Sequence, residues 1–144
     1  MSTTTHTWLQ MLDAQGYRLT HPLRAVVAVL VEAQRALAPT AIYDLARSAY
    51  PRLGLTTVYR SLEKLEEAGL IQRVHQPAGC HAYVAAVSGH QHLLICRHCG
   101  RTEYFSGDNL EPLMQHVSQS SGYDIQTHWL QFFGLCPLCQ KAPG

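Results

Sequence analysis

Two Cys-x-x-Cys pairs, Cys96/Cys99 and Cys136/Cys139, are the residues of this sequence best suited to chemistry. Each pair forms a tight turn that can direct two thiolates at one ion. Four thiolates make a closed tetrahedral zinc site with no open coordination position. The alternatives are thiol redox chemistry of one pair or two disulfides. A thioredoxin-type motif would use one pair at a helix start after a strand, so the duplication favours structural zinc.

A second group of possible metal ligands is His90, His92, Glu111 and His128. His90 and His92 share one side of an extended segment, because strand side chains alternate. We expect Glu111 in the first turn of a helix and His128 within a strand. Such a set can bind Zn(II), Fe(II), Mn(II) or Ni(II), and ligand softness does not choose among them. Each histidine could equally be a surface or core residue, so the spacing alone leaves both interpretations open.

The composition is that of a globular protein with one ordinary domain or two small ones. The chain has 144 residues, 47% hydrophobic and 15% charged, and a net charge of +1 that neither requires nor excludes nucleic acid. Residues 1–84 carry eight Lys and Arg against six Asp and Glu, so DNA affinity must come from local placement of cations. With no long apolar run and a polar start, we expect no membrane segment and a cytoplasmic protein. In that compartment, cysteines favour metal or redox chemistry over disulfides.

The first part of the chain has the pattern of a winged helix-turn-helix. We expect helices over 7–15, from a cap at Thr20 to about 36, from a cap at Thr40 to about 50, and from 56 or 57 to about 68. Two strands, 70–75 and 80–87, would then form a hairpin around a turn at 76–79. The alternative is a small helical domain with a hairpin and no nucleic-acid role.

The fourth helix has a polar face made of Thr57, Tyr59, Arg60 and Lys64. This face follows a tight turn, where a recognition helix presents side chains to the major groove. A tyrosine ring can pack on a thymine methyl group, and an arginine can reach phosphate or guanine. The pattern therefore favours a DNA-binding helix.

The last part of the chain predicts a second, smaller unit beyond a hinge at Ser88 and Gly89. We expect strands at 93–95, 102–105 and 123–133, and a helix capped by Asp108 or Asn109 and running to about 121. So few elements cannot bury much surface, and they need a partner, a metal or both. The predicted fold class is α+β, with a winged-helix DNA-binding domain over 1–87 and a small α/β dimerisation and metal-binding domain over 88–144.

The sequence resembles the ferric uptake regulator (Fur) superfamily of bacterial metalloregulators over nearly its whole length. The segments that carry the resemblance are 54–62, 65–70, 92–100 and 133–139. It implies a dimeric repressor whose winged helix binds an AT-rich inverted repeat. It also implies a C-terminal domain that dimerises around the four-cysteine zinc, and a regulatory metal between the domains that sets their relative angle.

The resemblance also assigns roles by position. Tyr59 and Arg60 match the family's recognition-helix contacts, and Arg18 matches a basic residue that reaches the DNA near the minor groove. The regulatory site between the domains falls on His90, His92, Glu111 and His128.

The sequence departs from the family at its other common sensing site. The matching positions hold Ala36, Val84, Gln91, Leu93 and Tyr104, none of which is a good metal ligand. This disfavours the peroxide-sensing branch, which needs an oxidisable iron site there.

A replacement site is conceivable on the wing hairpin. Its candidates are His75, Cys80 and His81, since Cys80 with a histidine could bind Zn(II). The alternative is a small buried cysteine and two wing histidines near DNA.

The predicted function is a cytoplasmic, non-enzymatic repressor of metal-uptake genes. It would bind a double-stranded operator as a homodimer, with structural Zn2+ and a regulatory Zn2+ or Fe2+. Zinc, and with it the zinc uptake regulator branch, is favoured because His92 stands where aspartate is a frequent alternative. The alternatives are an iron-responsive or other metal-responsive regulator, a zinc-stapled interaction module and a zinc enzyme. No general base or substrate pocket supports the enzyme.

Overall fold

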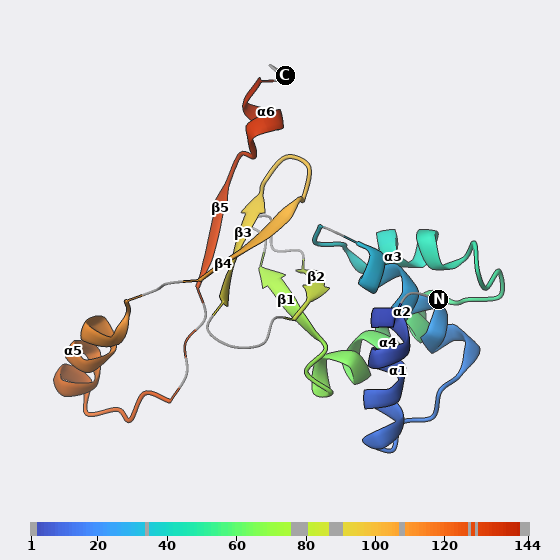
Figure 1. Cartoon of the computed structure of the whole chain (residues 1–144), viewed down its shortest axis with the longest axis horizontal. Helices are drawn as coiled ribbons and strands as arrows, with labels where there is room; N and C mark the ends of the chain where they lie inside the picture. The colour runs from blue at the N-terminus through green and yellow to red at the C-terminus, as the bar shows by residue number, and fades with distance from the viewer. Residues whose placement is uncertain are drawn as a thin grey trace.

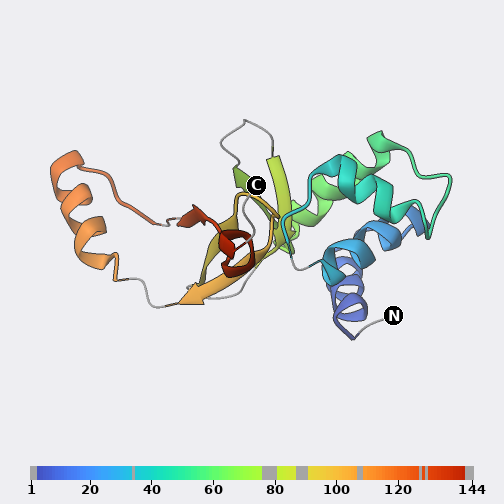
Figure 2. The same cartoon turned by 90° about the horizontal axis from the view of Figure 1, so that it is seen from above.

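A computed structural model describes residues 3–33, 35–75, 81–86, 91–106, 109–126, 128 and 130–141. The helices are α1 (Thr3–Ala14), α2 (His21–Glu32), α3 (Pro39–Ala46), α4 (Leu55–Glu67), α5 (Glu111–Ser121) and α6 (Pro137–Lys141). The strands are β1 (Ile71–His75), β2 (His81–Ala85), β3 (Gln91–Cys96), β4 (Thr102–Ser106) and β5 (Gln131–Gly134). Both views place α1–α4 at one end, the two sheets in the middle and α5 at the other end (Figures 1 and 2). The predicted α+β class, with a winged helix followed by a small α/β unit, is confirmed.

Helices α1–α4 pack around one apolar core that includes the fully buried Leu12, Val26, Ile42 and Val58. Within a helix the buried residues recur at helical spacing, as Val58, Leu62 and Leu65 do in α4, so each helix buries one face. Thr20 caps α2 as predicted, because its hydroxyl accepts a hydrogen bond from the Leu23 amide at 3.3 Å.

Two predicted helix caps are wrong. α3 begins at Pro39 after Ala38, and Thr40 lies inside the first turn without a capping hydrogen bond. A proline at the first helical position needs no capped amide and already has a helical φ, which explains the earlier start. Leu110 is the N-cap residue of α5, in place of Asn109, and Asp108 lies outside the described residues.

The strands form two small sheets. β1 and β2 make an antiparallel hairpin, the wing, and β4-β3-β5 make a three-stranded sheet in which β3 pairs antiparallel with β4 and parallel with β5. The strand predicted over 123–133 is correct only for its end, since β5 begins at Gln131. Helix α6 was not predicted. Within the part of the chain that the structure describes, no helix has the length and apolar character to cross a membrane.

A second apolar cluster joins the wing to the three-stranded sheet. Val74, Ala82 and Val84 of the wing meet Leu93 and Ile95 of β3, and Ala36 from the α2–α3 connection completes it. Two hydrogen bonds cross the same boundary, from the Tyr104 hydroxyl to the Ala85 carbonyl at 2.7 Å and from the side-chain Nε2 of Gln131 to the Arg73 carbonyl at 3.2 Å. We call this cluster the junction. The predicted hinge at Ser88 and Gly89 lies outside the described residues.

The α2–α3 connection touches both sides of the junction. Leu37 pairs with Tyr83 of the wing through two backbone hydrogen bonds of 2.9 and 2.8 Å. Ala36 donates its amide to the Gly100 carbonyl at 3.0 Å, beside the first cysteine pair. The helical end and the three-stranded sheet are therefore linked by packing and by hydrogen bonds.

Candidate metal centre and nucleic-acid interface

The parallel pairing of β3 and β5 brings the two cysteine pairs together. Cys96 ends β3 and lies opposite Gly134, the last residue of β5. The carboxyl ends of parallel strands meet at one edge of a sheet, so the segments that follow them are neighbours. Gly100 closes the first turn with φ of +78°, a conformation that favours glycine. Cys139, of the second pair, lies in α6.

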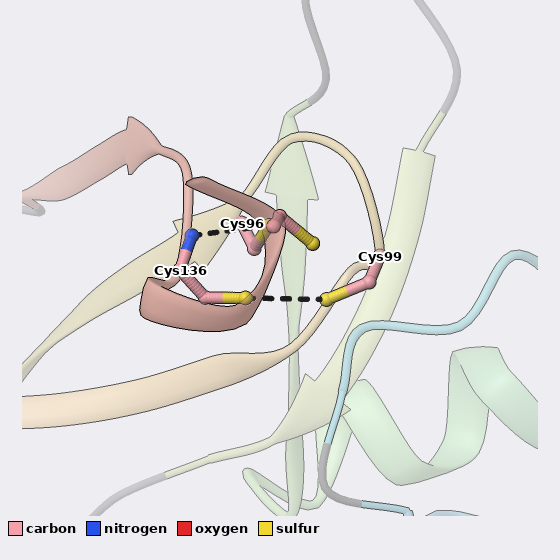
Figure 3. A group of neighbouring side chains, drawn as sticks. Cys96, Cys99 and Cys136 are labelled. Atoms are coloured by element: carbon pink, nitrogen blue, oxygen red, sulfur yellow. Dashed lines mark hydrogen bonds between the residues drawn. The ribbon is translucent and has the colours of Figure 1, made fainter. Parts of the chain in front are cut away.

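The four thiols converge on one point. Their sulfur atoms all lie within 4.8 Å of one another, and Cys99 Sγ lies 3.8 Å from Cys136 Sγ (Figure 3). With Zn–S bonds of about 2.3 Å, the sulfur atoms of a tetrahedral site lie about 3.8 Å apart. The cluster therefore fits a structural zinc ion, which would offset part of the thiolate charge and bind the end of β3 to the segment after β5.

Backbone amides stabilise the thiolate form of Cys96 in the cluster. Donation from the backbone of Cys99 and then Cys136 lowers the pKa of the Cys96 thiol to about 5. The Cys136 amide lies 3.4 Å from Cys96 Sγ (Figure 3). Hydrogen bonding to Cys136, with burial second, raises the pKa of Cys139 to about 12. The Cys96 thiolate therefore forms readily. The Cys139 thiolate needs a nearby cation such as zinc to stabilise its negative charge.

The second predicted set is only partly assembled. His92, on β3, is buried, and its ring centre lies 5.3 Å from that of His128. Glu111 is exposed at the start of α5, and His90 lies outside the described residues. Among the described residues, the four cysteines are the only group of three or more His, Cys, Asp or Glu side chains placed to share an ion. The structure therefore brings together two of the four predicted ligands.

Three of the five positions that the resemblance matched to the family's other sensing site lie in the junction. Ala36, Val84 and Leu93 lie in its apolar cluster, at 9%, 3% and 0% exposure. The Tyr104 hydroxyl is bound to the Ala85 carbonyl, and burial raises the pKa of this tyrosine. The methyl groups of Ala36, Val84 and Leu93 thus pack together between the wing and the sheet. The sequence analysis did not predict that these residues pack together.

The expected recognition helix has the exposure that DNA contact needs. Tyr59 is 47% exposed and Arg60 is exposed, whereas Val58, Ser61 and Leu62 of the same helix are buried. Thr57 and Lys64 are partly exposed, and Arg18 is exposed in the α1–α2 connection. One face of α4 is therefore fixed in the core and the other is open to a ligand.

The wing carries two of the three candidates for a replacement site. His75 and His81 are cross-strand partners at the end of the hairpin, and their ring centres lie 5.1 Å apart. Cys80 lies outside the described residues. His98, inside the first cysteine turn, is exposed.

A winged helix joined to a small sheet with a four-cysteine metal cluster defines a winged-helix metalloprotein. Residues 14–133 match the ferric uptake regulator family, and the chain belongs to that family. It is 30% identical to the ferric uptake regulation protein of Legionella pneumophila over 91% of this chain and 97% of that protein. It is 31% identical to the ferric uptake regulation protein of Bacillus subtilis over 90% of each. The chain is thus a member of a family of metal-responsive transcriptional regulators.

Solved structures share the fold. The zinc uptake regulator complexed with zinc and DNA has a TM-score of 0.75 at 23% identity, with 98% of this chain and 97% of that chain covered. The Helicobacter pylori ferric uptake regulator has a TM-score of 0.70 at 24% identity, covering 98% and 95%. The zinc-bound manganese uptake regulator has a TM-score of 0.68 at 22% identity, covering 90% and 98%. Similar folds thus occur in regulators named for three different metals.

Proposed function

We propose that this protein is a dimeric repressor that binds an AT-rich inverted-repeat operator when its regulatory site holds a metal, and so controls metal-uptake genes. The observation that carries the proposal is the exposure of Tyr59 and Arg60 on α4, whose opposite face is buried in the core. Arg18 and Lys64 would add phosphate contacts, and Thr57 would lie at the start of the contact face. The organisation into residues 1–87 for DNA and 88–144 for dimerisation belongs to the same proposal.

The exposed apolar surface of the C-terminal part supports dimerisation. Leu113 and Val117 of α5 are 57% and 42% exposed, and none of the residues of α5, all of which are described, is buried. Leu94 and Phe132, paired across β3 and β5, are 42% and 49% exposed. A helix without a buried face gains little stability alone. A second copy that covers α5 and this sheet face would supply the missing contacts.

The regulatory metal is proposed to bind His90, His92, Glu111 and His128. The closeness of His92 and His128 supports this, because their rings already face one region. Since Glu111 lies on the unpacked α5, binding all four ligands would dock the start of α5 near β3. Metal binding and formation of the dimer surface would then favour each other. Zinc is the favoured effector because three of the four ligands are imidazoles.

The test is metal-dependent operator binding. Sequences would be selected from a random DNA pool by the metal-loaded protein. Affinity for the selected operator would then be measured by fluorescence anisotropy against buffered Zn(II) and, under anaerobic conditions, Fe(II). We expect Zn(II) to raise affinity at lower free concentration than Fe(II). His92→Ala should remove this dependence, whereas His98→Ala, which changes another histidine close by, should retain it. Unchanged metal dependence in His92→Ala would show that the assigned site is wrong.

A second experiment separates the repressor from a zinc-stapled interaction module. The double variant Tyr59→Ala, Arg60→Ala removes two exposed side chains and leaves the core of α4 intact. Each base contact is worth about 1–3 kcal/mol, so we expect at least a tenfold loss of operator affinity with unchanged thermal stability. Equal DNA binding by the double variant would contradict the repressor.

A further inference from the structure

The end of the wing hairpin presents two imidazoles to each other. His75 is the last residue of β1, His81 is the first of β2, and the two are direct cross-strand partners. Side chains of directly opposed residues project from the same face of an antiparallel pair. Both side chains are exposed, and among the described residues neither makes a hydrogen bond or an ion pair. The two rings are therefore available to an ion from solvent.

The spacing of these rings matches a shared ion. With Zn–N bonds of about 2.1 Å and roughly 1.1 Å more from nitrogen to ring centre, two imidazoles on one tetrahedral ion have centres about 5.2 Å apart. The ring centres of His75 and His81 lie 5.1 Å apart, at an interplanar angle of 76°. Inclined rings of this kind can each direct a nitrogen at one point between them. The hairpin fixes the two backbone positions, so little further ordering is needed.

We propose that His75 and His81 form a two-histidine site on the wing for a divalent late transition metal, with zinc as the natural ion. Neutral imidazole suits Zn(II), Ni(II) and Cu(II), and the general affinity order makes Cu(II) the strongest binder of the three. Two protein ligands leave coordination positions open to water. The ion would link β1 to β2 across the turn and stabilise the paired hairpin against opening. This site is separate from the four cysteines and from the proposed regulatory set.

The proposal is tested by measuring how many further metal ions the full-length protein binds, and where, while zinc stays bound at the four cysteines. Beside any equivalent bound by the proposed regulatory set, isothermal titration with Zn(II) should show one weaker equivalent that is lost, or weakened at least tenfold, in His75→Gln and in His81→Gln. His6→Gln changes an exposed histidine of α1 and should retain that equivalent. In the His92→Ala background, which removes a ligand of the proposed regulatory set, substoichiometric Cu(II) should broaden the NMR signals of the His75 and His81 rings before those of other histidines. Zn(II) should slow amide exchange in β1 and β2 of the wild type and have no such effect in His81→Gln.

Two results would overturn the proposal. One is an unchanged number and affinity of Zn(II) equivalents in both wing variants. The other is loss of the weaker equivalent in Cys80→Ser while both histidine variants retain it, since the ion would then depend on sulfur and not on the imidazole pair. Because both histidines are exposed, we expect the variants to keep the wild-type circular dichroism spectrum. None of these measurements involves DNA, so failure here is distinguishable from failure of the proposed repressor function.

Discussion

Replacing Leu93 by alanine tests whether the wing and the three-stranded sheet are held together by apolar packing. Leu93 is 0% exposed and lies in the junction with Val84 and Ala36. Truncation of a fully buried leucine removes its transfer free energy and leaves a cavity, which costs about 2–5 kcal/mol. For a chain of this size each kcal/mol lowers the melting temperature by about 2–4 °C, so we expect a decrease of roughly 10 °C.

The assay is thermal unfolding followed by circular dichroism, at fixed protein concentration and with zinc retained at the cysteines. Leu45→Ala is the matched control, because it makes the same chemical change at a side chain that is 49% exposed. We expect this control to lose less than about 1 kcal/mol. If Leu93→Ala unfolds at the same temperature as Leu45→Ala, the junction contributes no packing energy and does not hold the wing to the sheet.

Three further substitutions test other parts of the structure. Cys136→Ser should abolish tight zinc binding, measured by metal analysis after chelator treatment, and Cys80→Ser should retain that zinc because Cys96, Cys99, Cys136 and Cys139 already supply four ligands. Gly100→Ala should destabilise the protein by about 1–2 kcal/mol in a urea titration, because φ is +78° at that position. Gly134→Ala is the control and should cost less, because an added Cβ there meets nothing within 4 Å. Thr20→Ala should lower the free energy of unfolding in urea by about 1 kcal/mol through loss of the α2 cap.

The four-cysteine cluster was predictable because its geometry is mostly local. Each Cys-x-x-Cys turn positions its own two thiols, and only the meeting of the two turns depends on the fold. The parallel pairing of β3 and β5 supplies that meeting. A repeated local motif therefore revealed a long-range contact, which a set of single residues such as His92 and Glu111 could not do.

The errors occur where local signals compete or are weak. Thr40 is a good cap residue, but Pro39 before it starts α3 one residue earlier. Residues 123–130 alternate like a strand, yet β5 pairs with β3 only from Gln131 onward. A strand forms only where a partner is available, and β3 is six residues long. No residue of α5 is buried, so burial of an apolar face did not decide where this helix lies among the described residues.

The two faces of strand β3 take part in different contacts, one in the junction and the other with possible metal ligands. Its side chains alternate, so Leu93 and Ile95 are buried in the junction against the wing, whereas His92 and Cys96 belong to the opposite set. On that opposite side His92 meets His128, and Cys96 joins the metal cluster. We infer that a metal bound at His92 would act on the wing through the position of β3 itself. Because the junction is packed, a shift of β3 would move the wing with it, and the Leu93→Ala variant should loosen this connection.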